Sequence, residues 1–211
     1  MDAVHQTVNE ALGFPLMDTF EKDITRFMES HSDDDESLTV ALIDLDHLLQ
    51  INESFGRDVG DQIMIQTGLF LAEDLPASAS IYRISGDEFG ILFEGIEKED
   101  VFLLMEKKRT EFSVLTPDGK PVTFSTGVAA AFEDAARYQE LIRKAESAMF
   151  RAKYTGRNKV ALAREEKMVP KTSHYTSDQL KRLSILSKRE GIGEAILLRE
   201  ALDMLLKKYP N

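Results

Sequence analysis

The stretch from Tyr82 to Phe93, YRISGDEFGILF, constrains the fold more than any other part of the chain. Two short apolar runs, 81–84 and 89–93, suit strands, and the four residues between them, Ser85-Gly86-Asp87-Glu88, suit a tight turn. The sequence therefore predicts a hairpin that carries two adjacent carboxylates at its tip. One interpretation is a solvated tip. The other is a bound divalent cation that also holds a phosphate, because hard cations take oxygen ligands from carboxylates and phosphates.

A second acidic site lies upstream and favours the cation. Residues 38–43 form an apolar run of strand length, and Asp44-Leu45-Asp46 follows directly. If this strand neighbours the hairpin in one sheet, Asp44 and Asp87 converge on a shared ion, and the carbonyl of Leu45 supplies a further oxygen ligand. The two acidic sites together indicate phosphoryl-transfer chemistry.

The remaining apolar patterns predict mostly helices around these strands. Helical spacing covers residues 8–29 with an interruption at 13–15, then 47–55, 61–75, 98–112 and 138–154, and further strands are expected over 122–130 and 158–163. This pattern alone indicates an α/β or an α+β protein.

Charge is unevenly distributed along the 211 residues, whose net charge is −11. From Lys167 onward the chain has nine Lys and Arg against five Asp and Glu, whereas the preceding part has 17 against 32. We therefore expect two domains, 1–166 and 167–211, with different partners. Nucleic acid suits only the second.

The chain has no cysteine, which excludes disulfides and thiolate metal sites. No apolar run approaches the ~20 residues that cross a bilayer, and the first residues do not have the pattern of a signal peptide. We expect a cytoplasmic protein that does not bind membranes.

Four blocks of this sequence resemble the GGDEF domain family, the diguanylate cyclases. The blocks are ALIDLDHLLQINESFGRDVGDQ, RISGDEFGILF, VTFSTGV and AESAMFRAKYTGRNKV, in the order and spacing of the family, and the resemblance covers about residues 9–162. It implies an α+β fold with a palm-like central sheet, similar to nucleotidyl cyclases and ferredoxin-like folds, that contains antiparallel strands and is flanked by helices. It also implies a homodimer in which two domains, each with one GTP and Mg²⁺ or Mn²⁺, form cyclic di-GMP and pyrophosphate.

The resemblance assigns roles to particular residues. Asp44 and Asp87 match the metal-binding carboxylates, with Leu45 as the backbone ligand, and Glu88 matches an acid that binds metal or deprotonates the attacking hydroxyl. The matching residues for substrate binding are Asn52 and Asp61 for guanine and Lys153 and Arg157 for the triphosphate.

Structural alternatives exist for several of these residues. Asp61 would also suit a helix N-cap after Gly60, and Lys153 and Arg157 would also offset the dipole at a helix C-terminus. Arg83, which many family members share, would also suit a cross-strand ion pair.

The sequence departs from the family at several positions. Ser85 replaces the first glycine of the signature, Leu49 replaces a usual lysine, and the opening segment 9–17 has lost most of its usual residues. The RxxD pair for product inhibition is replaced by Pro76-Ala77-Ser78-Ala79, so we expect no such inhibitory site. Ser85, Leu49 and the altered opening segment favour an alternative function, a catalytically weak domain that binds GTP or a cyclic dinucleotide as a ligand-controlled regulator.

Residues from Lys171 to Tyr209 resemble the ribbon-helix-helix family of DNA-binding dimers. The resemblance implies a ribbon strand at Thr172–Thr176 and two helices, the first capped by Ser177, joined by a turn at 191–193. If DNA is bound, Lys171, Ser173 and Tyr175 would enter the major groove. A dimerisation device without DNA binding is the alternative, because only one of these residues is basic.

Overall fold

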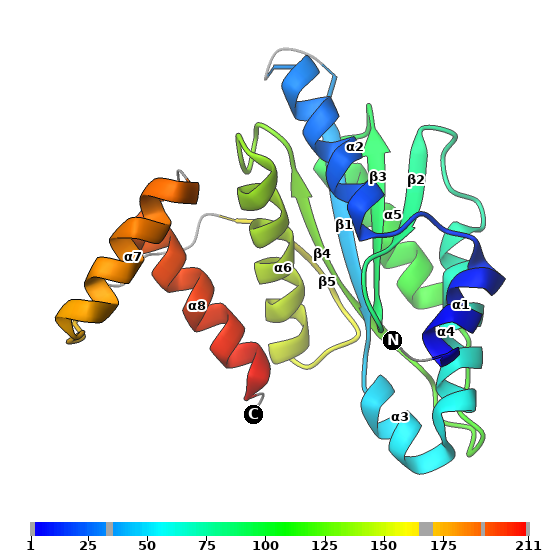
Figure 1. The fold of residues 1–211 in the computed structure, drawn as a ribbon. Helices are drawn as coiled ribbons and strands as arrows, with labels where there is room; N and C mark the ends of the chain where they lie inside the picture. Colours follow the sequence, from blue (N-terminus) through cyan, green and yellow to red (C-terminus); the bar gives the residue numbers. More distant parts are fainter. Residues whose placement is uncertain (1–2, 33–35, 165–170, 191–192, 210–211) are drawn as a thin grey trace. The chain divides into compact units, whose positions relative to one another are not determined.

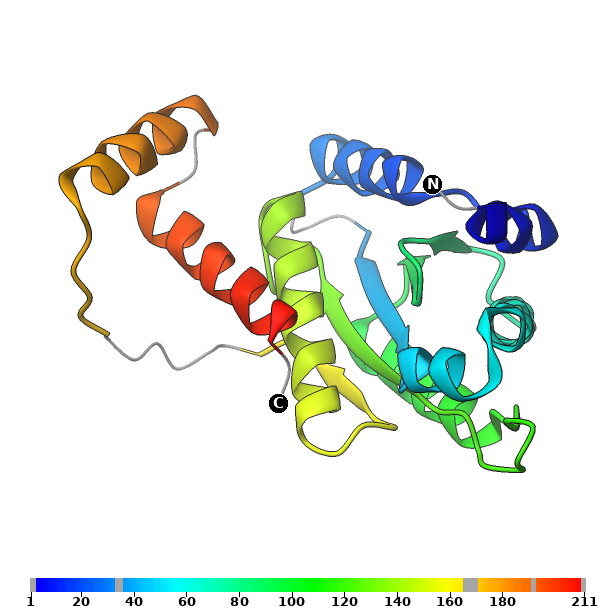
Figure 2. The same cartoon turned by 60° about the horizontal axis from the view of Figure 1, so that its bottom comes forward.

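The computed structural model describes residues 3–32, 36–164, 171–190 and 193–209. The chain divides into two compact units, Met1–Glu166 and Lys167–Asn211, and each is described by itself. The first unit is a layered arrangement of helices and strands, shown in two views in Figures 1 and 2. Its helices are α1 (Ala3–Leu12), α2 (Met17–Ser30), α3 (Leu48–Phe55), α4 (Arg57–Ala72), α5 (Lys98–Glu111) and α6 (Tyr138–Tyr154). Its strands are β1 (Leu38–Leu45), β2 (Ala79–Arg83), β3 (Glu88–Glu94), β4 (Phe124–Ala130) and β5 (Val160–Leu162).

The five strands form one mixed sheet in the order β2-β3-β1-β4-β5. β1 lies in the centre and pairs antiparallel with both β3 and β4, while β5 pairs parallel with β4. All eight residues of β1 are buried, which agrees with its nearly continuous apolar sequence. The predicted α+β fold, with antiparallel strands in a central sheet flanked by helices, is therefore confirmed.

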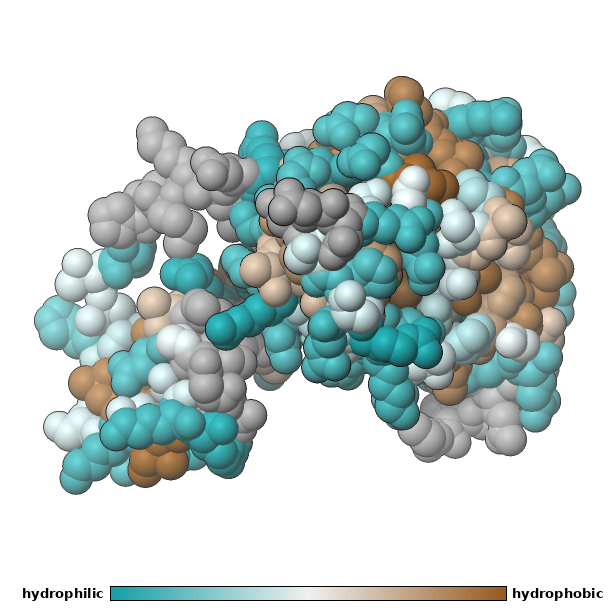
Figure 3. Space-filling view, turned by 90° about the horizontal axis from the view of Figure 1, so that it is seen from above, coloured by the Kyte–Doolittle hydropathy of each residue, from teal (hydrophilic) through white to brown (hydrophobic). Residues whose placement is uncertain are grey.

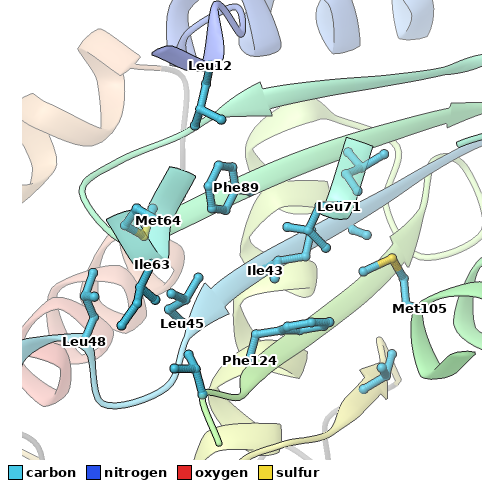
Figure 4. Close-up of a cluster of buried hydrophobic side chains, with 14 of the residues drawn as sticks. Leu12, Ile43, Leu45, Leu48, Ile63, Met64, Leu71, Phe89, Met105 and Phe124 are labelled. Carbon is cyan, nitrogen blue, oxygen red and sulfur yellow. The ribbon is translucent and has the colours of Figure 1, made fainter. Parts of the chain in front are cut away.

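Helices cover both faces of the sheet, and each face has its own apolar cluster. α1, α4 and α5 pack on one face around fully buried residues such as Phe89 and Phe124 (Figure 4). α2 and α6 cover the other face, where Phe20 is also fully buried. The side chains of β1 alternate between the two clusters, with Ile43 in the first and Leu42 in the second. Asp44 follows this alternation toward the α2 and α6 face.

The close packing of α6 on the sheet depends on Gly127 in β4. A Cβ at this position would lie 2.0 Å from the carbonyl oxygen of Ala145 and 2.3 Å from the backbone nitrogen of Met149. Because both obstructing atoms belong to the backbone of α6, no side-chain rotation would relieve the clash. The glycine thus fixes the position of the helix that carries Lys153.

Helix α4 begins earlier than the sequence predicts. The expected start was Asp61, but α4 extends from Arg57 to Ala72, so Asp61 lies in its second turn. The helix N-cap alternative for Asp61 is therefore wrong. Gly56, with φ of 90°, separates α3 from α4, and the backbone N–H of Gly56 donates to the carbonyl of Asn52 as a C-cap.

The second unit contains two helices, α7 (Ser177–Glu190) and α8 (Glu194–Lys208). Thr176, and not Ser177, caps α7: its hydroxyl accepts from the backbone of Gln179, whose side-chain oxygen accepts from the backbone of Thr176. This reciprocal pair is a capping box. The predicted strand Thr172–Thr176 is not formed in the single chain, and positions 191 and 192 of the predicted turn lie outside the described residues.

The two helices of the second unit expose large apolar side chains. Apolar residues are visible on its surface in Figure 3, and the exposed ones include Leu180, Ile185, Leu202, Met204, Leu205 and Leu206. Across the described parts of both units, every helix is too short or too polar to cross a membrane.

Candidate active site

The two acidic sites of the sequence meet at one end of the sheet. In the antiparallel pairing of β1 and β3, Asp44 lies directly opposite Glu88. The backbone N–H of Leu45 donates to the carbonyl of Asp87 at 3.1 Å. Acids that are more than forty positions apart in the chain are therefore neighbours.

Asp44 is buried, with an exposed fraction of 4%, and its two carboxylate oxygens differ. Oδ2 forms an ion pair with the ammonium of Lys153 from α6, whereas Oδ1 is buried with no hydrogen-bond partner. Burial raises the pKa of Asp44 to about 7; Lys153 opposes this increase, and the charges of Asp87 and Glu88 add to it. The site therefore holds more negative charge than its one paired lysine can neutralise.

These features fit a hard divalent cation. The orphaned oxygen of Asp44 is a buried acceptor, and carboxylates with a backbone carbonyl are ligands that magnesium accepts. Among the described residues, no group of three His, Cys, Asp or Glu side chains could hold a metal ion. A metal ion held here would therefore need further ligands, from the backbone or from a bound anion such as a phosphate.

The hairpin tip accommodates Ser85 without strain. The backbone of Ser85 does not adopt the left-handed conformation that would require glycine. Its hydroxyl donates to Glu88 Oε2 at 3.0 Å. Ser85 thus adds a hydrogen bond to one acid of the turn, whereas a glycine would leave that position without a donor.

The side chain of Arg83 also contacts this turn. Its side chain is buried, and Nη2 donates to the carbonyl of Gly86 at 2.9 Å. Burial lowers the pKa of Arg83, while the nearby charges of Asp61 and Asp87 raise it. The structure therefore shows a contact to its own turn instead of the cross-strand ion pair considered from the sequence, and it places this guanidinium near both of those acids.

Asn52 and Asp61 lie on the adjacent helices α3 and α4. A Cβ at Gly60 would lie 1.8 Å from Asn52 Oδ1, so the glycine makes room for this side chain. Asn52 Oδ1 is buried and has no partner. This unsatisfied acceptor is available to a donor on a ligand. Asp61 lies close enough to the acidic cluster for its charge to raise the pKa of Arg83.

Asp46 has a role that the sequence did not predict. Its carboxylate accepts from the hydroxyls of Thr123 (2.7 Å) and Ser125 (2.9 Å) and from the backbone N–H of Asn158 (3.0 Å). Asp46 thus anchors the loop that follows α6. Arg157 lies in this loop with φ of 60°, and its backbone N–H donates to the carbonyl of Ala152. None of the described contacts joins the side chain of Arg157 to Asp44, in contrast to Lys153.

A groove of about 350 Å³ lies beside helix α4. It is lined by Asp58, Val59, Gln62, Ile63, Gln66, Leu115, Thr116 and Pro117. The residues of the acidic cluster do not line this groove.

Comparison with family models places this acidic cluster in a known context. Residues 14–159 match the model described as "Diguanylate cyclase, GGDEF domain". The chain belongs to the GGDEF domain family. Residues 168–210 match the model of a ribbon-helix-helix domain, which confirms both resemblances found in the sequence.

Curated relatives of this GGDEF protein include probable diguanylate cyclases. The chain is 30% identical over 169 residues to the probable diguanylate cyclase DgcT of Escherichia coli strain K12, covering 76% of this chain and 37% of the relative. It is 33% identical over 128 residues to the probable diguanylate cyclase DgcC of the same strain, covering 59% of this chain and 34% of the relative. The chain thus spans only about a third of the length of these relatives.

Solved structures show the same fold. The GGDEF domain of YfiN, also called TpbB, from Pseudomonas aeruginosa superimposes with a TM-score of 0.68 at 24% identity, covering 74% of this chain and 99% of that chain. The GGDEF domain of DgcB from Caulobacter crescentus, solved in complex with c-di-GMP, gives a TM-score of 0.65 at 20% identity, covering 72% and 90%.

Proposed function

We propose that this GGDEF protein is a diguanylate cyclase that condenses two GTP into cyclic di-GMP. In each of two facing domains the 3′-hydroxyl of one GTP attacks the α-phosphate of the other. Two P–O bonds form, two bonds to the β-phosphates break, and two pyrophosphates leave. The observation that supports this proposal most strongly is the meeting of Asp44, Asp87 and Glu88 beside Lys153 at one end of the sheet.

The site residues divide into metal-binding and proton-accepting groups. Asp44, Asp87 and the carbonyl of Leu45 would hold magnesium or manganese, whose charge would stabilise the reacting phosphates. Glu88 lies opposite Asp44 and would accept the proton of the attacking hydroxyl. Ser85 would orient Glu88 through its hydrogen bond.

Other residues would position the nucleotide. The carboxylate of Asp61 would accept from the N1 and N2 hydrogens of guanine, and Asn52 would contact the other edge, a combination that disfavours adenine. Lys153 and Arg157 would contact the triphosphate. Holding two nucleotides in line in this way lowers the barrier by positioning and charge neutralisation, without a covalent intermediate.

The direct test is to incubate the purified protein with GTP and magnesium and to identify the products by mass spectrometry. We expect cyclic di-GMP and pyrophosphate from the wild type and none from the Asp87→Ala variant. If the wild type forms no more cyclic dinucleotide than Asp87→Ala, the cyclase proposal is wrong. A different cyclic dinucleotide would overturn only the assignment of the base.

A ligand-controlled regulator is the second candidate function. Leu49, which stands where the family has a lysine, is an apolar side chain with an exposed fraction of 70%, so one cation is missing near the phosphates. In this case the protein would bind GTP or cyclic di-GMP in calorimetry without turning GTP over. Binding without product formation would favour this function over catalysis.

We further propose that the second unit pairs with a second copy of itself. The exposed apolar side chains of α7 and α8 form a surface that this unit does not bury by itself. Pairing would raise the effective concentration of the two half-sites that the cyclase needs. The Leu205→Glu variant should shift the protein from dimer to monomer in sedimentation, whereas Lys181→Glu, a change outside the apolar set, should not.

DNA binding by the second unit is a separate question. Lys171, Ser173 and Tyr175 are exposed and alternate along one segment, as a DNA-reading ribbon requires. Titrating the full-length protein with a pool of labelled duplexes at two salt concentrations tests this binding. Salt-sensitive binding that Lys171→Ala weakens would support a DNA-binding ribbon, and absence of binding would leave dimerisation as the function of the unit.

A further inference from the structure

Lys153 contacts a group other than the one that substrate binding assigns to it. The proposed function gives Lys153 the triphosphate as its partner and gives Asp44 a divalent cation. In the structure these two residues bind each other instead, since the ammonium of Lys153 pairs with Asp44 Oδ2. Asp44 has a second, unpaired oxygen, Oδ1, but a metal ion bound there would lie close to the ammonium on Oδ2, and the two cations would repel each other.

The ion pair has a clear reason to exist without ligands. Asp44 is 4% exposed, and a buried carboxylate without a counter-ion is costly. Asp87 and Glu88 add negative charge at the same place. Of the described ion pairs, the one with Lys153 is the one that joins a cation to Asp44. The lysine therefore stabilises the site while the site holds neither metal nor nucleotide.

The surrounding structure would allow Lys153 to exchange partners without moving its helix. The backbone of α6 is fixed against β4 at Gly127 and closed at its C-terminus, where the N–H of Arg157 donates to the carbonyl of Ala152. The side chain of Lys153 is 28% exposed, so the protein does not enclose it completely. A rotation of this flexible side chain is sufficient to release Asp44.

We infer that Lys153 is a resident counter-ion of Asp44 that opposes metal binding there and leaves Asp44 when metal and nucleotide arrive together. The incoming cation would replace the ammonium at Asp44, and the released ammonium would bind the phosphates that accompany the cation. This inference rests on the proposed function. It gives Lys153 a positioning role in addition to phosphate binding, because the lysine suppresses metal binding in the absence of nucleotide.

This exchange has a thermodynamic consequence. Metal alone must bind against the charge of the ammonium without offering the ammonium a new partner, and nucleotide alone brings phosphates while Lys153 is still paired with Asp44. Each ligand therefore binds more tightly in the presence of the other, and the coupling is the same in both directions. Part of any such coupling also arises from direct metal–phosphate bonds, so the contribution of Lys153 has to be measured without nucleotide.

The test measures Mn²⁺ binding by electron paramagnetic resonance with the full-length protein and no nucleotide. The experiment is done at pH 8.5, so that protons compete little with the metal for Asp44. It is done under argon, so that oxygen does not oxidise the Mn²⁺. Lys153→Met removes the charge and keeps much of the side-chain volume, and we expect it to bind Mn²⁺ about tenfold more tightly than the wild type. Lys153→Arg keeps the charge and should bind Mn²⁺ as weakly as the wild type. Lys144→Met, a charge removal on the same helix, should have no effect.

A second titration separates failure of this inference from failure of the proposed function. The wild type is titrated with Mn²⁺ in the presence of a non-hydrolysable GTP analogue, and folding of each variant is verified by circular dichroism. If the wild type binds Mn²⁺ with the analogue but folded Lys153→Met shows no gain without it, the counter-ion role is wrong and the proposed function stands. If the wild type does not bind Mn²⁺ even with the analogue, the proposed metal site is wrong, and the counter-ion role is overturned with it.

Discussion

Two buried carboxylates at the end of β1 have nearly the same exposure and opposite surroundings. Asp46 accepts three hydrogen bonds, from Thr123, Ser125 and Asn158, which leaves both of its oxygens satisfied. Asp44, two residues earlier, has one oxygen paired with Lys153 and the other without a partner. The protein itself satisfies both oxygens of Asp46, whereas it leaves one buried oxygen of Asp44 without a hydrogen-bond donor.

The difference teaches how to separate structural from functional acids in this fold. A satisfied buried carboxylate holds elements together, and its loss leaves several donors unpaired. A buried carboxylate without a partner destabilises the folded state, and folding alone does not explain why it is there. A ligand that binds this carboxylate would remove the destabilisation. Asp46 should therefore affect stability, and Asp44 should affect chemistry.

The largest expected effect is on catalysis at Asp44. Asp44→Asn keeps the shape of the side chain and removes the charge that would hold the metal, so cyclic di-GMP formation should decrease by about 1000-fold or more. The rate of product formation, measured by chromatography, reports this change. Urea unfolding should show a fold at least as stable as the wild type. Substantial activity in Asp44→Asn would contradict the distinction between the two acids.

The next effect is on stability at Asp46. Asp46→Ala leaves the hydroxyls of Thr123 and Ser125 and the N–H of Asn158 without their acceptor, and the free energy of unfolding should decrease by about 3 kcal/mol. Chemical denaturation at constant pH measures this loss. A variant as stable as the wild type would show that the three hydrogen bonds do not anchor the loop after α6.

The raised pKa of Asp44 predicts how stability depends on pH when metal is absent. Because the folded pKa of about 7 lies above the ordinary value of 3.8, the folded state holds this proton more tightly than the unfolded state. The resulting stabilisation is complete below the unfolded pKa and disappears as the pH rises through about 7. Between pH 5.5 and pH 8, in EDTA, the wild type should therefore lose about 2 kcal/mol more unfolding free energy than Asp44→Asn. Equal slopes in the two proteins would be inconsistent with a raised pKa at Asp44.

Gly60 tests whether Asn52, whose buried oxygen also has no partner, contributes to ligand binding. In Gly60→Ala the new methyl group would collide with Asn52 Oδ1 and displace that side chain. We expect the affinity for GTP to decrease about tenfold in calorimetry, since a displaced amide cannot reach the base. Stability should stay the same or increase, because alanine suits a helix interior better than glycine. Unchanged GTP affinity would remove Asn52 from the proposed binding site.

Ser85 should give the smallest effect. Ser85→Gly restores the first glycine of the family signature and removes one exposed hydrogen bond to Glu88. Product formation should change by no more than about twofold, and the free energy of unfolding by about 0.5 kcal/mol. A large gain in activity would show that the serine holds Glu88 in an unproductive position.

The sequence predicted most of the sheet and the meeting of the two acidic sites. Asp44 follows an apolar run, and Asp87 lies at the tip of a hairpin. Once both segments are strands of one sheet, few arrangements of the strands keep these two acids apart. The role of Asp46 could not be predicted, because its partners are 77 to 112 positions away. The start of α4 was missed because Gly60 looked like the end of a turn. In the structure its missing side chain is needed inside a helix, where it accommodates Asn52.

The contact of Gly127 with the backbone of α6 has a consequence for regulation. A side chain at this position would force α6 away from the strand, so the glycine brings Lys153 close to the acids as soon as the domain folds. If the protein is the cyclase proposed above, regulation would then have more to gain from changing how often two domains meet than from moving α6 within one domain.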